Sequence, residues 1–281
     1  MIINGKKVAA DLRGELKKKV VELKSSYNAV PGLTVILVGK DPPSKIYVKN
    51  KEKYAIEIGI NSEVIRYPDN VEEKVVLNKI KELNKNDKVS GILVQLPLPK
   101  HINKRKVIET IDPKKDVDGL HPVNVGNLSS GYNSTIPCTP LGCYLLIKNT
   151  EKNLNGKHAV IIGRSNLNGK PMTQLLLKEN CTVTITHSKT KDLKSECSRA
   201  DIIVAAVGRP KLVKGDWVKK GAIVIDVGIN KTDNGLVGDV DFDEVSKVAK
   251  AITPVPGGVG PMTIACLLNN TVECFKKAQS N

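Results

Sequence analysis

A loop rich in glycine and proline has the residue types most suggestive of ligand binding. In Pro254–Thr263 seven of the ten residues are Pro, Gly or Thr, and an apolar run follows from Ile264 to Phe275. Three glycines and three prolines predict a rigid loop that a flat ligand can approach without hindrance from side chains. Pro261 suits the first position of a following helix, where its missing N–H is not needed. A tight structural turn is the alternative interpretation.

A second glycine-bounded loop, Gly163–Gly169, lies between an expected strand at 158–162 and an expected helix over 172–179. A strand, a glycine loop and a helix N-terminus in this order can hold a phosphate group. The spacing departs from Gly-x-Gly-x-x-Gly, so spacing alone is equally consistent with an ordinary strand–helix turn.

The residues after the next expected strand, 182–186, indicate which dinucleotide would bind. A site that prefers NAD usually places an acidic residue there to bind the ribose 2′-hydroxyl. Here His187–Lys191 offers hydroxyls and cations and no carboxylate. This composition favours NADP, whose 2′-phosphate an acid would repel; an ordinary polar strand end is the alternative.

Five segments of the chain resemble those of one family and occur in the same order, over essentially the whole sequence. They are Tyr47–Lys51, Gln95–Pro99, Asp116–Gly126, Gly163–Pro171 and Pro254–Thr263. The chain resembles the bifunctional methylenetetrahydrofolate dehydrogenase/methenyltetrahydrofolate cyclohydrolase family. Each segment alone is a weak or moderate indicator, but the set is highly specific.

The resemblance implies an enzyme of one-carbon metabolism and purine biosynthesis. It would oxidise 5,10-methylenetetrahydrofolate with NADP and hydrolyse the methenyl product to 10-formyltetrahydrofolate. Its partners would be tetrahydrofolate derivatives, with or without a polyglutamate tail, and a second copy of the chain in a homodimer. A dehydrogenase without cyclohydrolase activity is the first alternative, disfavoured because Lys51 and Gln95 are both present. A basic nucleic-acid-binding α/β protein is the second.

Lys51 is the residue to which we assign the hydrolytic chemistry. Tyr47 and Lys51 are four residues apart and share a face of a helix, and both match the family's Tyr-x-x-x-Lys motif. Hydride removal from the one-carbon bridge leaves a delocalised cation, which disfavours a neighbouring ammonium and lowers the pKa of the lysine. The neutral amine can then act as general base for the attacking water. Gln95 would hold the lysine or polarise the water.

The resemblance also assigns binding roles. Tyr47 would stack on the folate, and Asp118 would bind the pterin through two parallel N–H bonds, whereas Asp116 and His121 would be structural. Besides Tyr47, Lys51 and Asp118, the expected substrate-binding residues are Leu96, Pro97, Pro256, Gly257, Gly258, Val259, Gly260 and Thr263. The expected cofactor-binding residues are Thr139, Gly163, Arg164, Ser165, Ser188 and Ile229, and Asn168 stands where the family usually has an aliphatic residue.

Composition limits the class of protein. The net charge is +15, but the lysines lie along expected helix faces, and nine aromatic residues are too few for a nucleic-acid stacking platform. Solvated helix faces are the favoured interpretation of this charge, and a mild positive field that attracts polyanionic small molecules is the alternative. Six cysteines without a Cys-x-x-Cys pair indicate reduced, buried thiols and no metal site. No membrane span or signal peptide is evident, so we expect a cytoplasmic protein.

The hydrophobic pattern predicts an α/β protein of two domains with a cleft between them. Strands at 33–39, 61–66 and 91–95 alternate with helices at 47–58 and 71–83, and Asn4 can cap a first helix. The stretch 112–138 reads as a long loop, and Thr139-Pro140 as a helix start. Strands at 158–162, 182–186, 201–207 and 222–227 form a Rossmann-like series. The expected domains are 1–140 with 262–281, a three-layer folate-binding catalytic domain, and 141–261, an NADP-binding domain.

Overall fold

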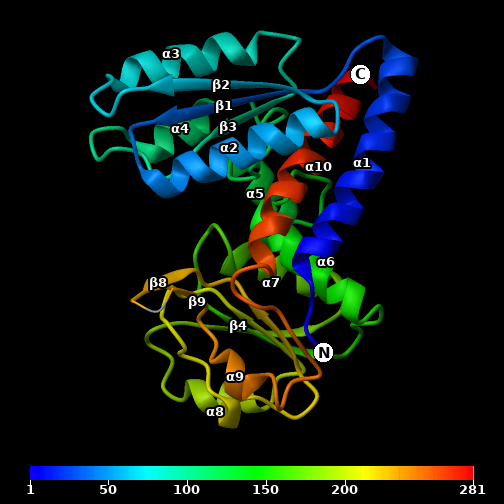
Figure 1. Cartoon of the computed structure of the whole chain (residues 1–281), viewed down its shortest axis with the longest axis vertical. Coiled ribbons are helices and arrows are strands. Elements are labelled where there is room, and N and C mark those ends of the chain that lie inside the picture. Colours follow the sequence, from blue (N-terminus) through cyan, green and yellow to red (C-terminus); the bar gives the residue numbers. More distant parts are fainter. Residues whose placement is uncertain (234, 281) are drawn as a thin grey trace. The chain divides into compact units, whose positions relative to one another are not determined.

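The computed structural model describes residues 1–233 and 235–280, which divide into two compact units. Unit 1 comprises Met1–Ala10 and Pro137–Cys266; unit 2 comprises Asp11–Ile136 and the chain from Leu267 onward. Each unit contains a parallel sheet flanked by helices (Figure 1), so the expected two-domain α/β fold is confirmed. The expected boundaries at 140/141 and 261/262, and the cleft, stay predictions.

Unit 2 is built on a three-stranded parallel sheet in the order β2-β1-β3. Its strands are β1 (Gly32–Val38), β2 (Asn61–Tyr67) and β3 (Gly91–Val94), and the helices between them in the sequence are α2 (Pro42–Glu57) and α3 (Glu73–Asn84). All seven residues of β1 and all four of β3 are buried, as in the doubly covered strands of parallel sheets. One face of the sheet packs against α3 and α4 (Lys104–Thr110) through an apolar core that includes Ile36, Ile80, Ile92 and Val107.

Unit 1 contains a five-stranded parallel sheet in the order β10-β7-β6-β4-β5. The strands are β4 (His158–Ile162), β5 (Thr182–Thr186), β6 (Ile202–Ala205), β7 (Ile223–Asp226) and β10 (Ala251–Ile252). Because β5 and β6 pair with opposite sides of β4, the strand order reverses there, as in dinucleotide-binding folds. The helices and hairpin of this unit are α6 (Cys138–Thr150), α7 (Gly169–Lys178), α8 (Leu193–Ser198), η1 (Gly215–Trp217), α9 (Phe242–Val245), β8 (Asn230–Thr232) and β9 (Gly235–Val237).

Two long helices contribute residues to both units. Helix α1 (Gly5–Tyr27) begins where the Asn4 side chain accepts a hydrogen bond from the Lys7 amide, 3.0 Å, as the sequence predicted. Helix α10 runs from Val259 to Gln279. The prediction that Pro261 starts this helix is wrong by two residues, since the backbone is already helical at Val259. No helix in the described part of the chain is long and apolar enough to cross a membrane.

Three other expectations about local structure are corrected. Helix α2 begins at Pro42, five residues early, because Asp41 caps it and prolines suit its first positions. The supposed long loop contains α5 (Pro122–Ser129), and the unpredicted α4 is capped by Asn103. Thr139 is not the N-cap of α6, which starts at Cys138 after Pro137.

Candidate functional site

Helix α2 places Tyr47 and Lys51 one turn apart in unit 2. The Asp41 carboxylate accepts hydrogen bonds from the Ser44 amide, 3.0 Å, and the Ser44 hydroxyl, 2.5 Å, which closes the first turn. Tyr47 is half-buried, and burial raises the pKa of its hydroxyl above the usual 10. Lys51 is only 8% exposed, unusual for a lysine. The helix therefore presents a neutral phenol and a sheltered amine on one face.

The side chain of Lys51 contacts Gln95, 44 residues away in the sequence. Its Nζ donates to Gln95 Oε1 at 2.9 Å, and Gln95 Nε2 donates to the carbonyl of Leu96 at 2.7 Å. Gln95 directly follows β3, so the rigid sheet determines where its amide lies. Leu96 is half-buried, and Pro97, joined to it by a cis peptide bond, is exposed. The Gln95 side chain thus binds Lys51 through its amide oxygen, while its amide nitrogen binds the Leu96 carbonyl.

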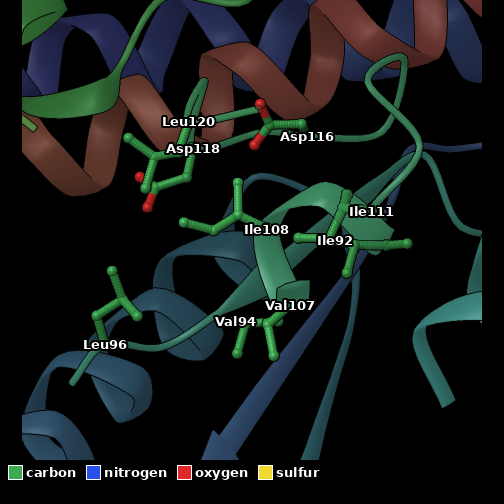
Figure 2. Close-up of a pocket in the computed structure, with 9 residues that line it drawn as sticks. All are labelled: Ile92, Val94, Leu96, Val107, Ile108, Ile111, Asp116, Asp118 and Leu120. Carbon is green, nitrogen blue, oxygen red and sulfur yellow. The ribbon is translucent and has the colours of Figure 1, made fainter. Parts of the chain in front are cut away.

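An apolar pocket opens beside this strand end, and Figure 2 shows the residues that line it. Asp118 and Leu120 lie at the top of the view, Leu96 at the lower left, and Val94 and Val107 at the bottom. Two carboxylates, Asp116 and Asp118, thus lie beside a lining that is otherwise apolar. A flat heterocycle with an N–H edge suits such a surface. The full lining is Ile92, Val94, Leu96, Val107, Ile108, Ile111, Asp116, Asp118 and Leu120.

Asp116 and His121 make hydrogen bonds within their own segment, which is consistent with the structural roles expected of them. Asp116 is 1% exposed, and its Oδ2 accepts from the His121 amide, 2.8 Å, and from Asn124 Nδ2, 2.9 Å. His121 Nδ1 accepts from the Val123 amide at 3.1 Å and caps α5. These bonds shape the segment that carries Asp118.

The loop 254–263 belongs to unit 1, and its three glycines differ in their surroundings. Gly257 has φ +106°, a conformation that favours glycine. At Gly258 a Cβ would lie 2.6 Å from the carbonyl oxygen of Pro254. At Gly260 it would meet nothing within 4 Å. Packing or backbone conformation explains the first two glycines, and nothing in the described chain explains the third.

The remaining expected residues of this loop are placed as follows. Pro256 is exposed, Val259 is buried and Thr263 is half-buried. The Thr263 hydroxyl lies 3.0 Å from that of Thr139 on α6, so these two predicted binding residues are in contact.

The glycine-bounded loop after β4 is compact. A Cβ on Gly169 would lie 1.9 Å from the Gly163 carbonyl oxygen, and one on Gly163 would lie 2.4 Å from that of Ala206. Gly163 also has φ +117°. Ser165 Oγ accepts from the Asn168 amide at 3.1 Å, while the Asn168 side chain makes no capping bond to α7. Both glycines are required by close backbone approach, and the loop they bound leads into the amino end of α7, the type of position where proteins bind phosphates.

Polar and cationic groups surround this loop. Arg164 and Ser165 are exposed, and Ser188, two residues beyond β5, is exposed as well. Ile229, three residues beyond β7, is 52% exposed, unusual for its type. The carboxyl ends of these parallel strands share one edge, where open α/β sheets bind ligands. The exposed groups at this edge include a hydroxyl and a guanidinium, which are group types that bind phosphates.

Sequence reasoning missed one part of this edge. The loop after β6, residues 206–210, contacts Gly163 of the glycine-bounded loop through Ala206, yet this loop is not named in the sequence analysis. Its Gly208-Arg209-Pro210 turn directly after a strand was the available signal. The structure thus assembles Tyr47, Lys51, Gln95, Leu96, Pro97 and Asp118 in unit 2, and the other predicted residues in unit 1.

Two family models match the chain. The catalytic-domain model of tetrahydrofolate dehydrogenase/cyclohydrolase matches residues 3–118, and the NAD(P)-binding-domain model matches 137–279. The bifunctional protein FolD of Pelagibacter ubique is 75% identical over 279 residues, covering 99% of each chain. The crystal structure of the bifunctional enzyme FolD from Campylobacter jejuni has 50% identity and a TM-score of 0.96, covering 99% of each chain. A Trypanosoma brucei enzyme, solved with NADP cofactor and inhibitor, has 39% identity and a TM-score of 0.94, covering 100% of this chain and 99% of that one.

Proposed function

The chain belongs to the tetrahydrofolate dehydrogenase/cyclohydrolase family, and from this premise we propose a specific pair of reactions. The enzyme oxidises 5,10-methylenetetrahydrofolate with NADP and hydrolyses the product, 5,10-methenyltetrahydrofolate, to 10-formyltetrahydrofolate, a one-carbon donor for purine biosynthesis. The Trypanosoma brucei structure with NADP supports this choice of cofactor.

The sheltered Lys51–Gln95 pair is the observation that carries the hydrolytic half of the proposal. Hydrolysis requires a water to attack the methenyl carbon and lose a proton. Lys51 is 8% exposed and its Nζ lies 2.9 Å from Gln95 Oε1, so an amine is held at a defined place. Once neutral, that amine can take the proton from the water. Tyr47 on the same face of α2 would cover the planar substrate.

Asp118 would anchor the pterin. Its carboxylate stands over the apolar pocket of Figure 2, and the pterin amino group and ring N–H can donate to its two oxygens. Leu96 and Pro97 would complete this end of the site. The loop residues Pro256, Gly257, Gly258, Val259, Gly260 and Thr263 are further proposed folate contacts.

NADP would be held by the glycine loop and the strand ends of unit 1. Gly163 and Ser165 at the amino end of α7 would receive the pyrophosphate, and Arg164 and Ser188 the 2′-phosphate. Thr139 and Ile229 would contact the remainder. When bound, the nicotinamide accepts the hydride from the one-carbon bridge.

A spectrophotometric assay tests both reactions. Methylenetetrahydrofolate with NADP should yield reduced cofactor and a methenyl absorbance that then decays. We expect Lys51→Met to slow that decay by about 100-fold or more, the scale of general base catalysis, while a folate analogue still binds. Lys49→Met, an exposed lysine on the same helix, is the matched control and should change neither activity. Hydrolysis by Lys51→Met at the parental rate would rule out the assignment.

Asp118→Asn distinguishes substrate anchoring from a role in one step. Asparagine keeps the size but replaces one acceptor with a donor. Both activities should fall together, since both need the same bound ring. Loss of hydrolysis with intact dehydrogenation would show that Asp118 is not the pterin anchor.

We also propose a homodimer that works in the cytoplasm. Strand β5 is an edge of the five-stranded sheet, and Ile185 on it is 38% exposed, a surface suited to pairing with another strand. All six cysteines are free and buried, which suits a reducing compartment. Light scattering of the parent and of Ile185→Lys tests the dimer: the parent should have twice the chain mass and the variant should dissociate.

A further inference from the structure

Asp239 is a fully buried carboxylate that accepts hydrogen bonds from amide groups of the loop after β6 and of Asn230, the first residue of β8. Its exposed fraction is 0%, and it lies in unit 1 just after the β8–β9 hairpin. Oδ2 accepts from the amides of Val207, 2.6 Å, and Gly208, 3.0 Å. Oδ1 accepts from the amide of Arg209, 2.9 Å, and from Asn230 Nδ2, 2.9 Å. Four donors thus satisfy both oxygens, and three of them come from consecutive residues.

These donors lie at the edge of the sheet where a ligand would bind. Residues 207–209 follow β6, and Asn230 follows β7 directly after Ile229. The loop after β6 begins with Ala206, whose carbonyl oxygen would lie 2.4 Å from a Cβ on Gly163 of the glycine-bounded loop 163–169. The strand order reverses at β4, with β5 on one side and β6 on the other. Asp239 therefore holds residues on the β6 side of this reversal.

The strand order predicts that the two halves of a bound dinucleotide lie on opposite sides of β4. In the proposed function the 2′-phosphate of the adenosine half lies at Arg164 and Ser188, on the β4 and β5 side. The pyrophosphate crosses at the amino end of α7, so the nicotinamide half must extend over the ends of β6 and β7. These two strand ends lead into the residues that bind the Asp239 carboxylate, Val207–Arg209 after β6 and Asn230 after β7.

A second buried carboxylate holds Asp239 in place. Asp226 Oδ1 accepts from the Asp239 amide, 2.9 Å, and from the Gly228 amide, 3.0 Å, while Oδ2 accepts from the Val240 amide, 2.9 Å. Asp226 itself ends β7, so the arrangement is anchored to the sheet. Each loop is thereby fixed through hydrogen bonds to a rigid strand.

We propose that Asp239 is a positioning residue for hydride transfer, an inference that rests on the proposed function. Asp239 orders the segments after β6 and β7, which receive the nicotinamide half of NADP. It acts through Val207–Arg209 and Asn230 and does not touch the cofactor. A charged acceptor for three successive amides selects one conformation of the β6 turn. Without it, the turn would sample others and the hydride acceptor would lose its alignment.

Asp239→Asn in the full-length protein tests the proposal, because one acceptor oxygen becomes a donor facing N–H groups. We expect NADP affinity to fall about tenfold or more, the scale of one lost charge-assisted hydrogen bond, and kcat for hydride transfer to fall as well. Adenosine 2′,5′-bisphosphate, which occupies only the adenosine end, should bind as to the parent. Methenyl hydrolysis measured without NADP should also be unchanged.

Two further variants keep the test decisive. Asn230→Ala removes one donor from a half-buried position and should give a smaller shift of the same kind, whatever the folding of Asp239→Asn. Asp201→Asn is the matched control: it accepts from the His158 amide, 2.9 Å, and from Lys219 Nζ, 2.6 Å, at the opposite ends of β4 and β6. It should leave NADP affinity unchanged.

The outcomes separate this inference from the proposed function. A parent without NADP-dependent hydride transfer would refute the function itself. With an active parent, folded Asp239→Asn or Asn230→Ala variants that retain parental NADP affinity and kcat would overturn the inference. A parallel loss of bisphosphate binding, hydrolysis and hydride transfer would also overturn it, because Asp239 would then serve only general stability.

Discussion

The hydrogen bond between Lys51 and Gln95 allows a quantitative prediction about hydrolysis. Gln95→Met keeps the length of the side chain but removes the oxygen that lies 2.9 Å from Lys51 Nζ. A hydrogen bond to a group that carries charge contributes about 1.5–3 kcal/mol. If that energy is lost in the transition state, kcat for methenyl hydrolysis falls about 10- to 150-fold, since each 1.36 kcal/mol is tenfold.

Gln95→Glu tests the same contact by placing a negative charge beside Lys51. A carboxylate at this position would pair with the lysine and favour its ammonium form. The ammonium has no lone pair and cannot act as a base. We therefore expect hydrolysis by Gln95→Glu at neutral pH to be slower than by Gln95→Met, and to recover as the pH is raised.

Decay of methenyl absorbance under saturating substrate measures kcat, and reduction of NADP in the same samples provides an internal control. Gln95 also donates to the Leu96 carbonyl at 2.7 Å, so a general disturbance of the strand end would reduce both reactions. Selective loss of hydrolysis supports a role through Lys51. Parental hydrolysis by Gln95→Met, or an equal loss of both reactions, would refute the reasoning.

Three other perturbations give distinct expected results. Arg164→Ala should weaken NADP binding about 10- to 150-fold, the range for a charge-assisted hydrogen bond, and leave NAD binding nearly unchanged; equal losses in titrations with both cofactors would indicate a pyrophosphate contact or a role in folding. Gly260→Val should hinder binding of a folate analogue far more than binding of NADP, whereas Gly14→Val, at an equally open helical glycine, should affect neither, and undiminished analogue affinity in a folded Gly260 variant would make the loop a structural turn. Burial raises the pKa of Asp226 from 3.8 to about 6, so the folded state holds the extra proton between these values and stability falls as pH rises through them. Denaturant unfolding of the parent relative to Asp226→Asn should therefore lose about 3 kcal/mol between about pH 2 and pH 8, at 1.36 kcal/mol per pKa unit, and a pH-independent difference would contradict this.

The central strands were predictable because most of them are continuous apolar runs bounded by polar residues, whereas the edge strands β2 and β5 also carry polar side chains. The expected ranges 158–162 and 182–186 coincide with β4 and β5. Buried strands of parallel sheets must be apolar on both faces, so such runs are clear indicators. The alternation of these runs with helical patterns was sufficient to predict the two-unit α/β fold.

Helix starts were less predictable because the capping groups were unusual. Asp41 caps α2 in front of two prolines, a sequence that reads as a turn. His121 caps α5 with a ring nitrogen, a role ordinarily taken by Ser, Thr, Asp or Asn. Thr139 has the expected residue type for a cap, but its hydroxyl faces Thr263 instead. Which polar group closes a first turn depends on neighbours that the local sequence does not specify.

Contacts between distant residues lay beyond sequence reasoning without the family resemblance. Lys51 and Gln95 are 44 residues apart and meet because α2 packs against β1 and β2, while β1 pairs with β3, which ends just before Gln95. The Tyr47 and Lys51 spacing predicts a shared helix face but not what that face meets. Likewise, the proximity of Asp118 to Leu96 around one pocket follows from the sheet and not from either motif.

Some glycines are required by contacts with residues that are distant in the sequence. Gly228 and Gly238 read as ordinary turn glycines, yet a Cβ there would lie 2.3 Å from Asp239 Oδ1 and 1.8 Å from Asp226 Oδ2. The buried carboxylates, and not a positive φ, exclude side chains at both positions. Gly260 has neither constraint among the described residues. A glycine that the chain itself does not require is the kind that a bound ligand would explain, and for this reason the loop 254–263 remains our choice for the folate contact.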